Sequence, residues 1–125
     1  MLGNCGIVAY AATADSVSAK RFYAEILGLT FVHEDDFALV FEANGTPLRI
    51  QKLTKFVPQA HTLLGWTVAD IADTVRRLAS NGLAFENYGF PGQDPSGIWP
   101  SPSGAKIAWF KDPDGNVLSL TEPAA

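Results

Sequence analysis

The chain has 125 residues, of which 47% are hydrophobic and 18% charged, and its formal net charge is -4 at pH 7. This composition excludes a disordered chain, and a negative charge without clustered Lys and Arg argues against a nucleic-acid partner. We expect one compact domain, 1–125, whose partner is a small molecule or another protein.

Cysteine usage and the N-terminus point to a cytoplasmic protein. Cys5 is the single thiol, which excludes an intrachain disulfide and fits a reducing compartment. The first residues lack a basic region, and no run of about 18 apolar residues occurs. We therefore expect no export signal and no membrane association.

The first half of the chain begins with an apolar stretch at 7–12, followed by a predicted helix. Asp15 and Ser16 can cap this helix, and Gly28 ends it. Its apolar residues recur at roughly helical spacing: Val17, Phe22, Tyr23, Ile26 and Leu27.

Three strands are predicted after the helix, at 29–33, 37–43 and 48–53. The pair Asn44-Gly45 is a strong signal for a hairpin between the last two. The order is therefore strand, helix and three strands.

This order begins again after a linker at 55–60. A strand is predicted at 63–68, Asp70 caps a second helix, and Gly82 ends it. The helix has one predicted apolar face: Ile71, Val75, Leu78 and Ala79. Because "GLTF" at 28–31 matches "GLAF" at 82–85, we predict an internal duplication, with modules at about 3–54 and 61–122.

The second module contains a long insertion at 87–105 that is rich in Gly, Pro and Ser. This composition excludes regular structure over most of its length. Two interpretations remain open: a functional loop in which Trp99 is an apolar lid, or an ordered surface loop with Trp99 in the core.

The segment "WFKDPDGNVLSL" at 109–120 holds two apolar blocks apart with an acidic cluster. Pro113 fixes φ, Gly115 permits positive φ, and Asp side chains accept hydrogen bonds from nearby backbone N–H groups. A calcium loop needs further oxygen ligands and a closing Glu, which are absent. We interpret Asp112 and Asp114 as turn residues.

Two βαβββ copies, "RFYAEILGL" at 21–29 and "FKDPDGNVLSL" at 110–120 together resemble the vicinal oxygen chelate superfamily, which includes glyoxalase I, bleomycin resistance proteins and extradiol dioxygenases. The resemblance covers nearly the whole chain. It implies an α+β fold in which two βαβββ modules form curled mixed sheets around a cleft, and it implies a homodimer.

In the metal-using members, the resemblance implies four ligands, two from each module. The matching positions here are Val8, Arg49, Leu63 and Ser119. None of them is a His or Glu, and a divalent site generally needs three or four N, O or S ligands. We expect no metal and no other cofactor. The alternative is a shifted register, in which His61 and Gln51 would be ligands, whereas His33 is expected to face solvent at a strand end.

Side chains that share strand parity with these four positions should face the cleft. Those residues, with the two tryptophans as aromatic walls, form the predicted ligand-binding cleft: Val8, Tyr10, Arg49, Gln51, His61, Leu63, Trp99, Trp109 and Ser119. An apolar pocket with few polar groups is typical of a site for small organic molecules. The opposite parity should pack on the helices: Ala9, Leu64, Trp66, Val68, Leu118 and Leu120.

Arg49 is the most informative of the predicted cleft residues. A guanidinium in a partly apolar cleft would bind a carboxylate or phosphate, unless it pairs with Glu42, Asp94 or another carboxylate, or reaches solvent. Trp109 has a core residue as its alternative interpretation. Only His61 and Tyr10 qualify by parity as acid-base groups, so no catalytic residue is assigned.

Three readings of the function follow. The first is a metal-free small-molecule binding protein, of the resistance or sequestration type, for an anionic or aromatic compound. The second is a lyase, isomerase or dioxygenase, either metal-dependent with displaced ligands or metal-free with His61. The third is a protein-interaction module with a vestigial cleft.

Overall fold

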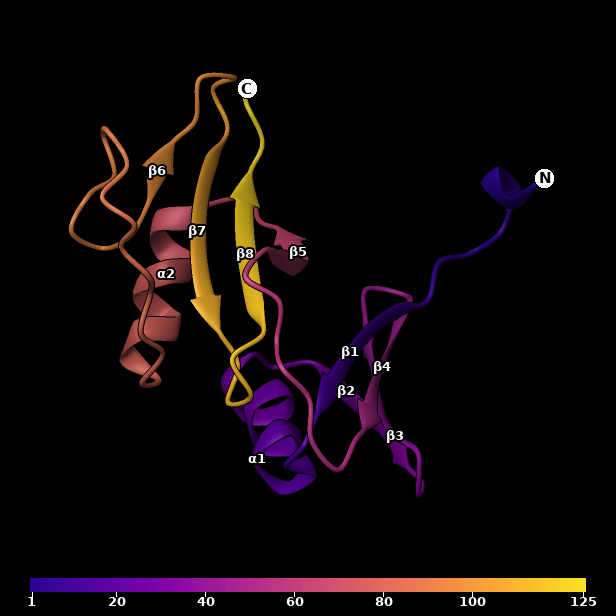
Figure 1. Cartoon of the computed structure of the whole chain (residues 1–125). Helices are drawn as coiled ribbons and strands as arrows, with labels where there is room; N and C mark the ends of the chain where they lie inside the picture. The colour runs from indigo at the N-terminus through magenta and orange to yellow at the C-terminus, as the bar shows by residue number, and fades with distance from the viewer. The chain divides into compact units, whose positions relative to one another are not determined.

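The computed structural model of the chain describes all residues from Met1 to Ala125. The chain forms two compact units, Met1–Val57 and Pro58–Ala125. Each unit has a four-stranded mixed sheet with a helix on one face (Figure 1). The predicted α+β class and the repeated βαβββ order are confirmed.

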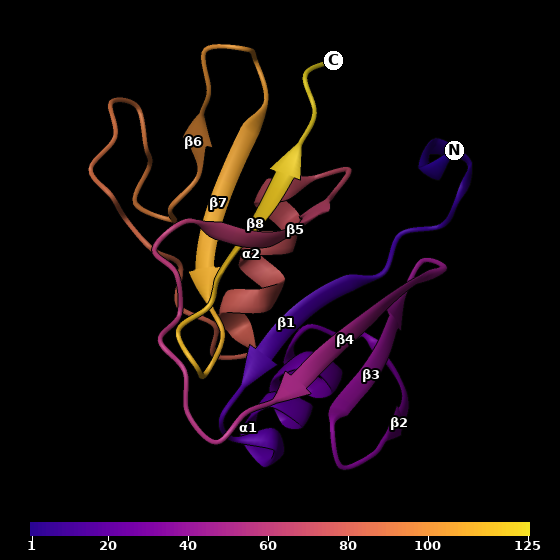
Figure 2. The same ribbon diagram turned by 45° about the vertical axis from the view of Figure 1, so that its right-hand side comes forward.

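The first unit contains seven elements, in this order: η1 (Leu2–Asn4), β1 (Ala9–Thr13), α1 (Ser16–Arg21), η2 (Phe22–Ile26), β2 (Thr30–Glu34), β3 (Ala38–Ala43) and β4 (Thr46–Lys52). η1 is a 3₁₀ turn, and η2 is a π-helical continuation of α1. The sheet order is β1-β4-β3-β2, with β1 parallel to β4 and the other pairs antiparallel (Figure 2).

Local chemistry explains where these elements begin and end. The Asp15 side chain caps α1 by accepting the backbone N–H of Ser18 at 3.2 Å. Asn44 and Gly45 have φ of 50° and 84°, as a tight two-residue hairpin requires. The Gly45 N–H also donates to the Glu42 carboxylate at 2.9 Å, so the predicted hairpin is confirmed.

One face of the first sheet packs against the helical segment. Phe41 and Leu48 are paired across β3 and β4, and Phe41 contacts the buried ring of Tyr23 at a centroid distance of 5.8 Å. The buried helical positions include Ala19 and Phe22, whereas Val17 is 80% exposed. The prediction that Val17 belongs to the apolar face is wrong, because the stripe begins at Ala19 and a position two residues earlier lies about 200° around the helix.

The second unit contains five elements: β5 (Thr62–Thr67), α2 (Ile71–Ser80), β6 (Trp99–Pro100), β7 (Lys106–Lys111) and β8 (Val117–Glu122). The sheet order is β5-β8-β7-β6, with β5 parallel to β8. Asp70 caps α2 through the backbone N–H of Asp73, and the Glu122 carboxylate accepts the N–H of Ile71 at 3.1 Å. The end of β8 is thereby joined to the start of α2.

The core of the second unit lies between α2 and one face of β7 and β8. Ile71 and Val75 are buried on the helix, but Ala79 is exposed. The prediction for Ala79 is wrong, because Ala79 follows Ile71 by eight residues and therefore lies about 80° around the helix from it, towards the exposed side. The sheet side of the core is closed by aromatic stacking of Trp66 on Phe110, with ring centroids 6.3 Å apart.

The two units repeat the same order of elements with one difference. Between helix and second strand, the first unit has a short turn, whereas the second has the long segment that the sequence places at 87–105. β6 within this segment is only two residues long, so regular structure is absent over most of it, as predicted. No helix has the length and apolar character needed to cross a membrane.

Candidate functional site

The acidic cluster near the C-terminus is a turn. Asp112 is 5% exposed, and its Oδ1 accepts the backbone N–H groups of Asp114 and Asn116, both at 3.0 Å. Its Oδ2 accepts the Asn116 side-chain amide at 2.8 Å, and Gly115 has φ of 92°. The carboxylate of Asp112 is therefore occupied by the turn that joins β7 to β8.

In the first unit, the sheet face opposite α1 carries a row of predicted site residues. Tyr10 of β1 is paired with Arg49 of β4, and Arg49 is paired with Val40 of β3. Directly paired residues project to the same side of a sheet, so these three side chains are neighbours. Tyr10 is 50% exposed and Arg49 is partly buried.

Gln51 lies two residues beyond Arg49 on the same face and is exposed. Val8 precedes β1 and is 44% exposed. The structure thus brings Tyr10, Arg49 and Gln51 together on one sheet face.

The residues that match the family ligand positions do not fit a metal ion. Val8 and Leu63 have hydrocarbon side chains, and Arg49 offers no lone pair to a cation. Ser119 supplies a single hydroxyl, which faces Gly65 on the neighbouring strand. Nowhere do three His, Cys, Asp or Glu side chains gather in a geometry that could hold an ion.

The residues that a shifted register would supply as ligands do not form a metal site either. His61 is exposed and precedes β5, and Gln51 is exposed in the first unit. His33 faces solvent on β2, as predicted, and lies 3.8 Å from the Asp35 carboxylate. Each of the two histidines therefore stands outside any three-ligand cluster.

In the second unit, the sheet face opposite α2 carries the remaining predicted residues. Gly65, Ser119 and Trp109 lie in one row across β5, β8 and β7. Trp99 of β6 is paired with Ile107, which lies two residues before Trp109 on the same face. Both predicted tryptophans are therefore on one side of one sheet.

Four aromatic rings gather on this side, and we call them the aromatic cluster: Tyr88, Phe90, Trp99 and Trp109. Ring centroids are 5.3 Å apart for Phe90 and Trp99, 5.7 Å for Phe90 and Trp109, and 5.9 Å for the two indoles. Tyr88 contacts Phe90 and Trp109 at 5.4 and 5.5 Å. Tyr88 and Phe90 are still 43% and 39% exposed, so the cluster presents ring surface to solvent.

The polar atoms of both indoles are already bonded within the unit. Trp109 Nε1 donates to Thr62 Oγ1 at 3.2 Å, and Trp99 Nε1 donates to the Pro91 carbonyl at 3.2 Å. These bonds fix the orientation of the rings. What the cluster offers a ligand is consequently ring faces and edges, which bind by apolar and stacking contact.

The segment that supplies Tyr88 and Phe90 is held by side chains of its own. Gln93 Nε2 donates to the carbonyls of Glu86 and Gly97, at 3.2 and 2.9 Å, and its Oε1 accepts the Tyr88 N–H at 2.9 Å. Asp94 Oδ1 accepts the N–H groups of Ser96 and Ile98 in the same segment. Trp99 thus lies on the short strand β6, next to this ordered segment, and its side chain is only partly buried.

Burial of the phenol raises the pKa of Tyr88, and the nearby Glu86 carboxylate adds to the effect. Tyr88 is therefore neutral at physiological pH and contributes an uncharged ring to the cluster.

Sequence reasoning identified the two tryptophans but missed Tyr88 and Phe90. Their signal was present, because two aromatic residues inside a segment rich in Gly, Pro and Ser have no strand or helix to bury them. The spacing of 88, 90, 99 and 109 gives no hint that the four rings meet, since their contacts depend on how the segment folds back on β7.

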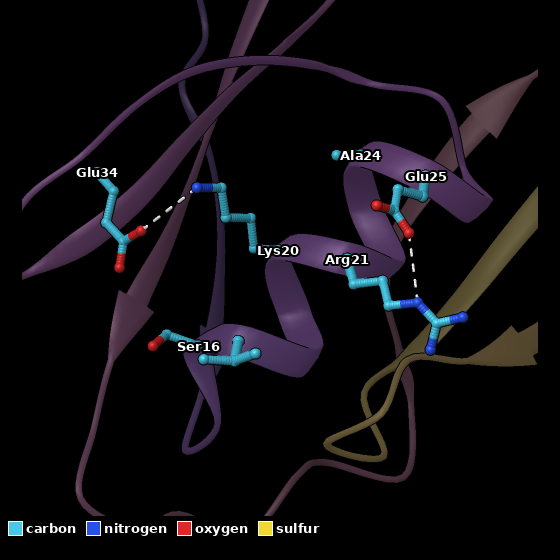
Figure 3. Close-up of a pocket in the computed structure, with 7 residues that line it drawn as sticks. Ser16, Lys20, Arg21, Ala24, Glu25 and Glu34 are labelled. Atoms are coloured by element: carbon cyan, nitrogen blue, oxygen red, sulfur yellow. Dashed lines mark hydrogen bonds and ion pairs between the residues drawn. The ribbon is translucent and has the colours of Figure 1, made fainter.

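Two surface grooves lie away from these faces. One, of about 370 Å³, runs along the outer side of α1 and contains four charged side chains (Figure 3). The Glu34 carboxylate forms ion pairs with Lys20 and Lys52, and Arg21 forms an ion pair with Glu25 at 3.3 Å. A smaller groove of about 280 Å³ lies beside the start of α2 and includes the Lys106–Glu122 pair. None of the predicted site residues lines either groove.

Comparison with solved structures shows the same fold in several proteins of low identity. The bleomycin resistance determinant encoded on the transposon Tn5 is 22% identical, with a TM-score of 0.75 over 95% of this chain and 98% of that chain. A putative glyoxalase family protein from Bacillus anthracis is 16% identical, with a TM-score of 0.74 over 98% and 99%. Lactoylglutathione lyase from Agrobacterium tumefaciens is 16% identical, with a TM-score of 0.72 over 94% and 93%.

No functionally curated protein matches the chain. A family model does match it, over residues 7–120, which is nearly the whole sequence and includes both βαβββ units. The chain therefore belongs to the Glyoxalase/Bleomycin resistance protein/Dioxygenase superfamily.

Proposed function

We propose that this protein binds a small organic molecule, aromatic or anionic, without the metal ion used by part of its superfamily, and that it acts by sequestration. The observation that supports this most directly is the aromatic cluster. Four rings on one sheet face, partly exposed and held by hydrogen bonds, form a ready surface for a flat ligand.

The absence of ligating side chains supports the metal-free part of the proposal. The four matched positions supply two hydrocarbon groups, a guanidinium and a hydroxyl. Such a set cannot replace the imidazole and carboxylate ligands that a divalent ion needs. The alternative, a lyase, isomerase or dioxygenase with displaced ligands, finds no three-ligand cluster to support it.

The proposed ligand-binding residues are those predicted from the sequence, extended by the two rings found in the structure. In the first unit the predicted residues are Val8, Tyr10, Arg49 and Gln51. In the second unit they are His61, Leu63, Trp99, Trp109 and Ser119, and the added ones are Tyr88 and Phe90. A cytoplasmic location and a homodimeric state complete the proposal, the first from the single cysteine and the second from the family resemblance.

The first experiment measures metal content. Elemental mass spectrometry is applied to the protein as purified, and again after incubation with Zn, Ni, Mn and Fe salts and dialysis. We expect no ion to remain near one per chain. A stoichiometric ion whose removal abolishes an activity would overturn the proposal and make His61 the leading ligand.

The second experiment measures binding of flat aromatic probes, with 2-naphthamide as the neutral reference, by tryptophan fluorescence and calorimetry. Phe90→Ala and Trp99→Leu remove rings of the aromatic cluster, and we expect each to weaken binding about three- to thirtyfold. Phe37→Ala is the matched control, since Phe37 is 77% exposed and lies outside the cluster. Equal weakening by all three variants would count against the cluster as the site.

A further inference from the structure

The sheet face of the first unit opposite α1 differs in chemistry from the aromatic cluster of the second. Four of its polar side chains can donate hydrogen bonds: Tyr10, His33, Arg49 and Gln51. We call this group the donor face. The one carboxylate that the strands carry on this face, Glu42 of β3, accepts the Gly45 N–H at 2.9 Å and forms no ion pair with Arg49. A surface built from donors around a permanent cation is complementary to an anion.

Strand register places these donors side by side around Arg49. Tyr10 is the Cα partner of Arg49 on β1, and Val40 is its partner on β3. His33 is in turn paired with Val40, which puts it at the far end of the same row. β4 lies between β1 and β3, so the backbone of Arg49 is held from both sides (Figure 2).

The next row has small side chains beside Gln51. Gln51 is flanked by Ala12 on β1 and Ala38 on β3. Because alanine carries only a methyl group, neither directly paired neighbour of Gln51 is bulky, whereas Arg49 has Tyr10 and Val40 beside it. A ligand group has access to both side chains from the solvent side.

The charge of Arg49 is not neutralised by an ion pair. No carboxylate of its own unit lies within 4 Å of the guanidinium, although the side chain is partly buried. The Glu34 carboxylate pairs instead with Lys20 and Lys52, and the Glu25 carboxylate pairs with Arg21. Removing part of the hydration of a cation without supplying a counter-charge is unfavourable, and an incoming anion would offset that cost.

Asp35 is an acidic residue that interacts electrostatically with Arg49, but its carboxylate already accepts other hydrogen bonds. Its Oδ1 accepts the backbone N–H groups of Phe37 and Ala38, at 2.8 and 2.9 Å, and its Oδ2 lies 3.8 Å from His33. Those two hydrogen bonds are the main cause of its lowered pKa, with smaller contributions from the charges of Arg49 and His33. Asp35 therefore acts on Arg49 from a distance and does not occupy its donors.

We propose that Arg49 binds an oxyanion of the ligand, a carboxylate or a phosphate, with Tyr10 and Gln51 as flanking donors. This rests on the proposed function, since it names the residue that would bind a ligand of the anionic class proposed there. The guanidinium fork donates two parallel N–H bonds to a carboxylate or phosphate, and a lysine cannot reproduce this geometry.

The experiment compares three probes that share one ring system: 2-naphthoate, 2-naphthyl phosphate and neutral 2-naphthamide. Affinities are measured by calorimetry with the wild-type protein and with Arg49→Gln, Arg49→Lys and Arg21→Gln. Arg21→Gln is the matched control, because it makes the same charge change at an exposed residue of α1. We expect Arg49→Gln to weaken at least one anionic probe about ten- to a hundredfold while leaving naphthamide unchanged. Arg49→Lys should restore only part of the affinity.

A direct measurement at Arg49 keeps this inference separate from the proposed function. The Nε–H signal of Arg49 is followed by ¹H–¹⁵N NMR while acetate or inorganic phosphate is added to the wild-type protein. We expect a saturable shift for Arg49 that Arg21 does not show. The stronger of the two anions, together with the better of the two charged naphthyl probes, identifies the oxyanion as carboxylate or phosphate.

The outcomes separate the two ideas. If naphthamide binds as tightly as both charged probes, or if Arg49→Gln and Arg21→Gln weaken them equally, the anion site is wrong while aromatic binding stands. If no naphthyl probe binds but Arg49 shifts with acetate or phosphate, the aromatic part of the proposed function fails and the anion site stands. If neither binding nor a shift is seen, both are overturned.

Discussion

Asp112 stabilises a turn, although an acidic residue in such a cluster resembles a metal ligand. Its carboxylate is buried, and both oxygens accept hydrogen bonds from the turn that follows. A buried carboxylate with that many donors is satisfied without a cation.

Replacing Asp112 by Ala should destabilise the protein by about 2 to 3 kcal/mol, because the buried N–H groups of the turn lose a charged acceptor. Urea unfolding followed by circular dichroism measures the change. Asp36→Ala is the control, since Asp36 is exposed and should alter stability by less than about 0.5 kcal/mol. A similar small change for both variants would show that the turn does not depend on its carboxylate.

Because of Tyr88, the free energy of unfolding of the second unit depends on pH at alkaline values. The pKa of Tyr88 is raised in the folded chain, first by burial and then by Glu86, above its ordinary value of 10.0. The folded state therefore keeps the phenol proton when the unfolded state has begun to lose it, and the stabilisation, complete below pH 10, is lost as pH rises through the folded-state pKa. We expect Tyr88→Phe to lessen the fall in melting temperature above pH 10, and an unchanged alkaline profile would contradict this.

At the scale of elements, the segment before β6 has no regular secondary structure, yet side-chain hydrogen bonds hold it in a defined conformation. Gln93 joins its two arms with three hydrogen bonds, and Asp94 closes the inner turn. These bonds position Tyr88 and Phe90 against the indoles. The order of the aromatic cluster thus depends on side chains that do not touch the cluster's exposed surface.

Replacing Gln93 by Ala should loosen this segment without unfolding the protein. Loss of the hydrogen bond at the Tyr88 amide, about 1 kcal/mol, should speed its hydrogen exchange roughly fivefold and weaken binding of aromatic probes. Gln59→Ala, in the exposed linker before β5, is the control and should change neither. Faster exchange throughout both sheets would instead indicate global destabilisation.

At the scale of the whole molecule, the architecture consists of the βαβββ order repeated twice, and the predicted internal duplication would account for this repeat. Each unit buries the helix-facing side of its own sheet, with Tyr23 and Phe41 in one and Trp66 and Phe110 in the other. The interpretation of 1–125 as one domain stays a prediction from length and from the family resemblance.

The homodimer is likewise a prediction of the family resemblance. Sedimentation equilibrium at micromolar protein concentration should give a mass of two chains of 13.4 kDa. A single-chain mass at all concentrations up to about 100 μM would show that association is absent in the free protein.

By itself, the sequence determined the order of elements and the turns that separate them. Asp15 and Asp70 cap helices, Asn44-Gly45 forms a hairpin, and 112–116 forms a turn, because these effects act between residues a few positions apart. Strand parity likewise follows from a local rule, which is why Tyr10 and Arg49 were expected on the same face and lie on the same face.

The tertiary structure alone decided which side chains meet. Val17 and Ala79 were misplaced because the spacing of apolar residues does not show how wide a part of each helix the sheet covers, and both residues lie outside that part. The meeting of Tyr88 and Phe90 with Trp99 and Trp109, and the lack of a close carboxylate at Arg49, depend on contacts between segments far apart in the chain. Such contacts are set by packing of the whole unit, and no local pattern encodes them.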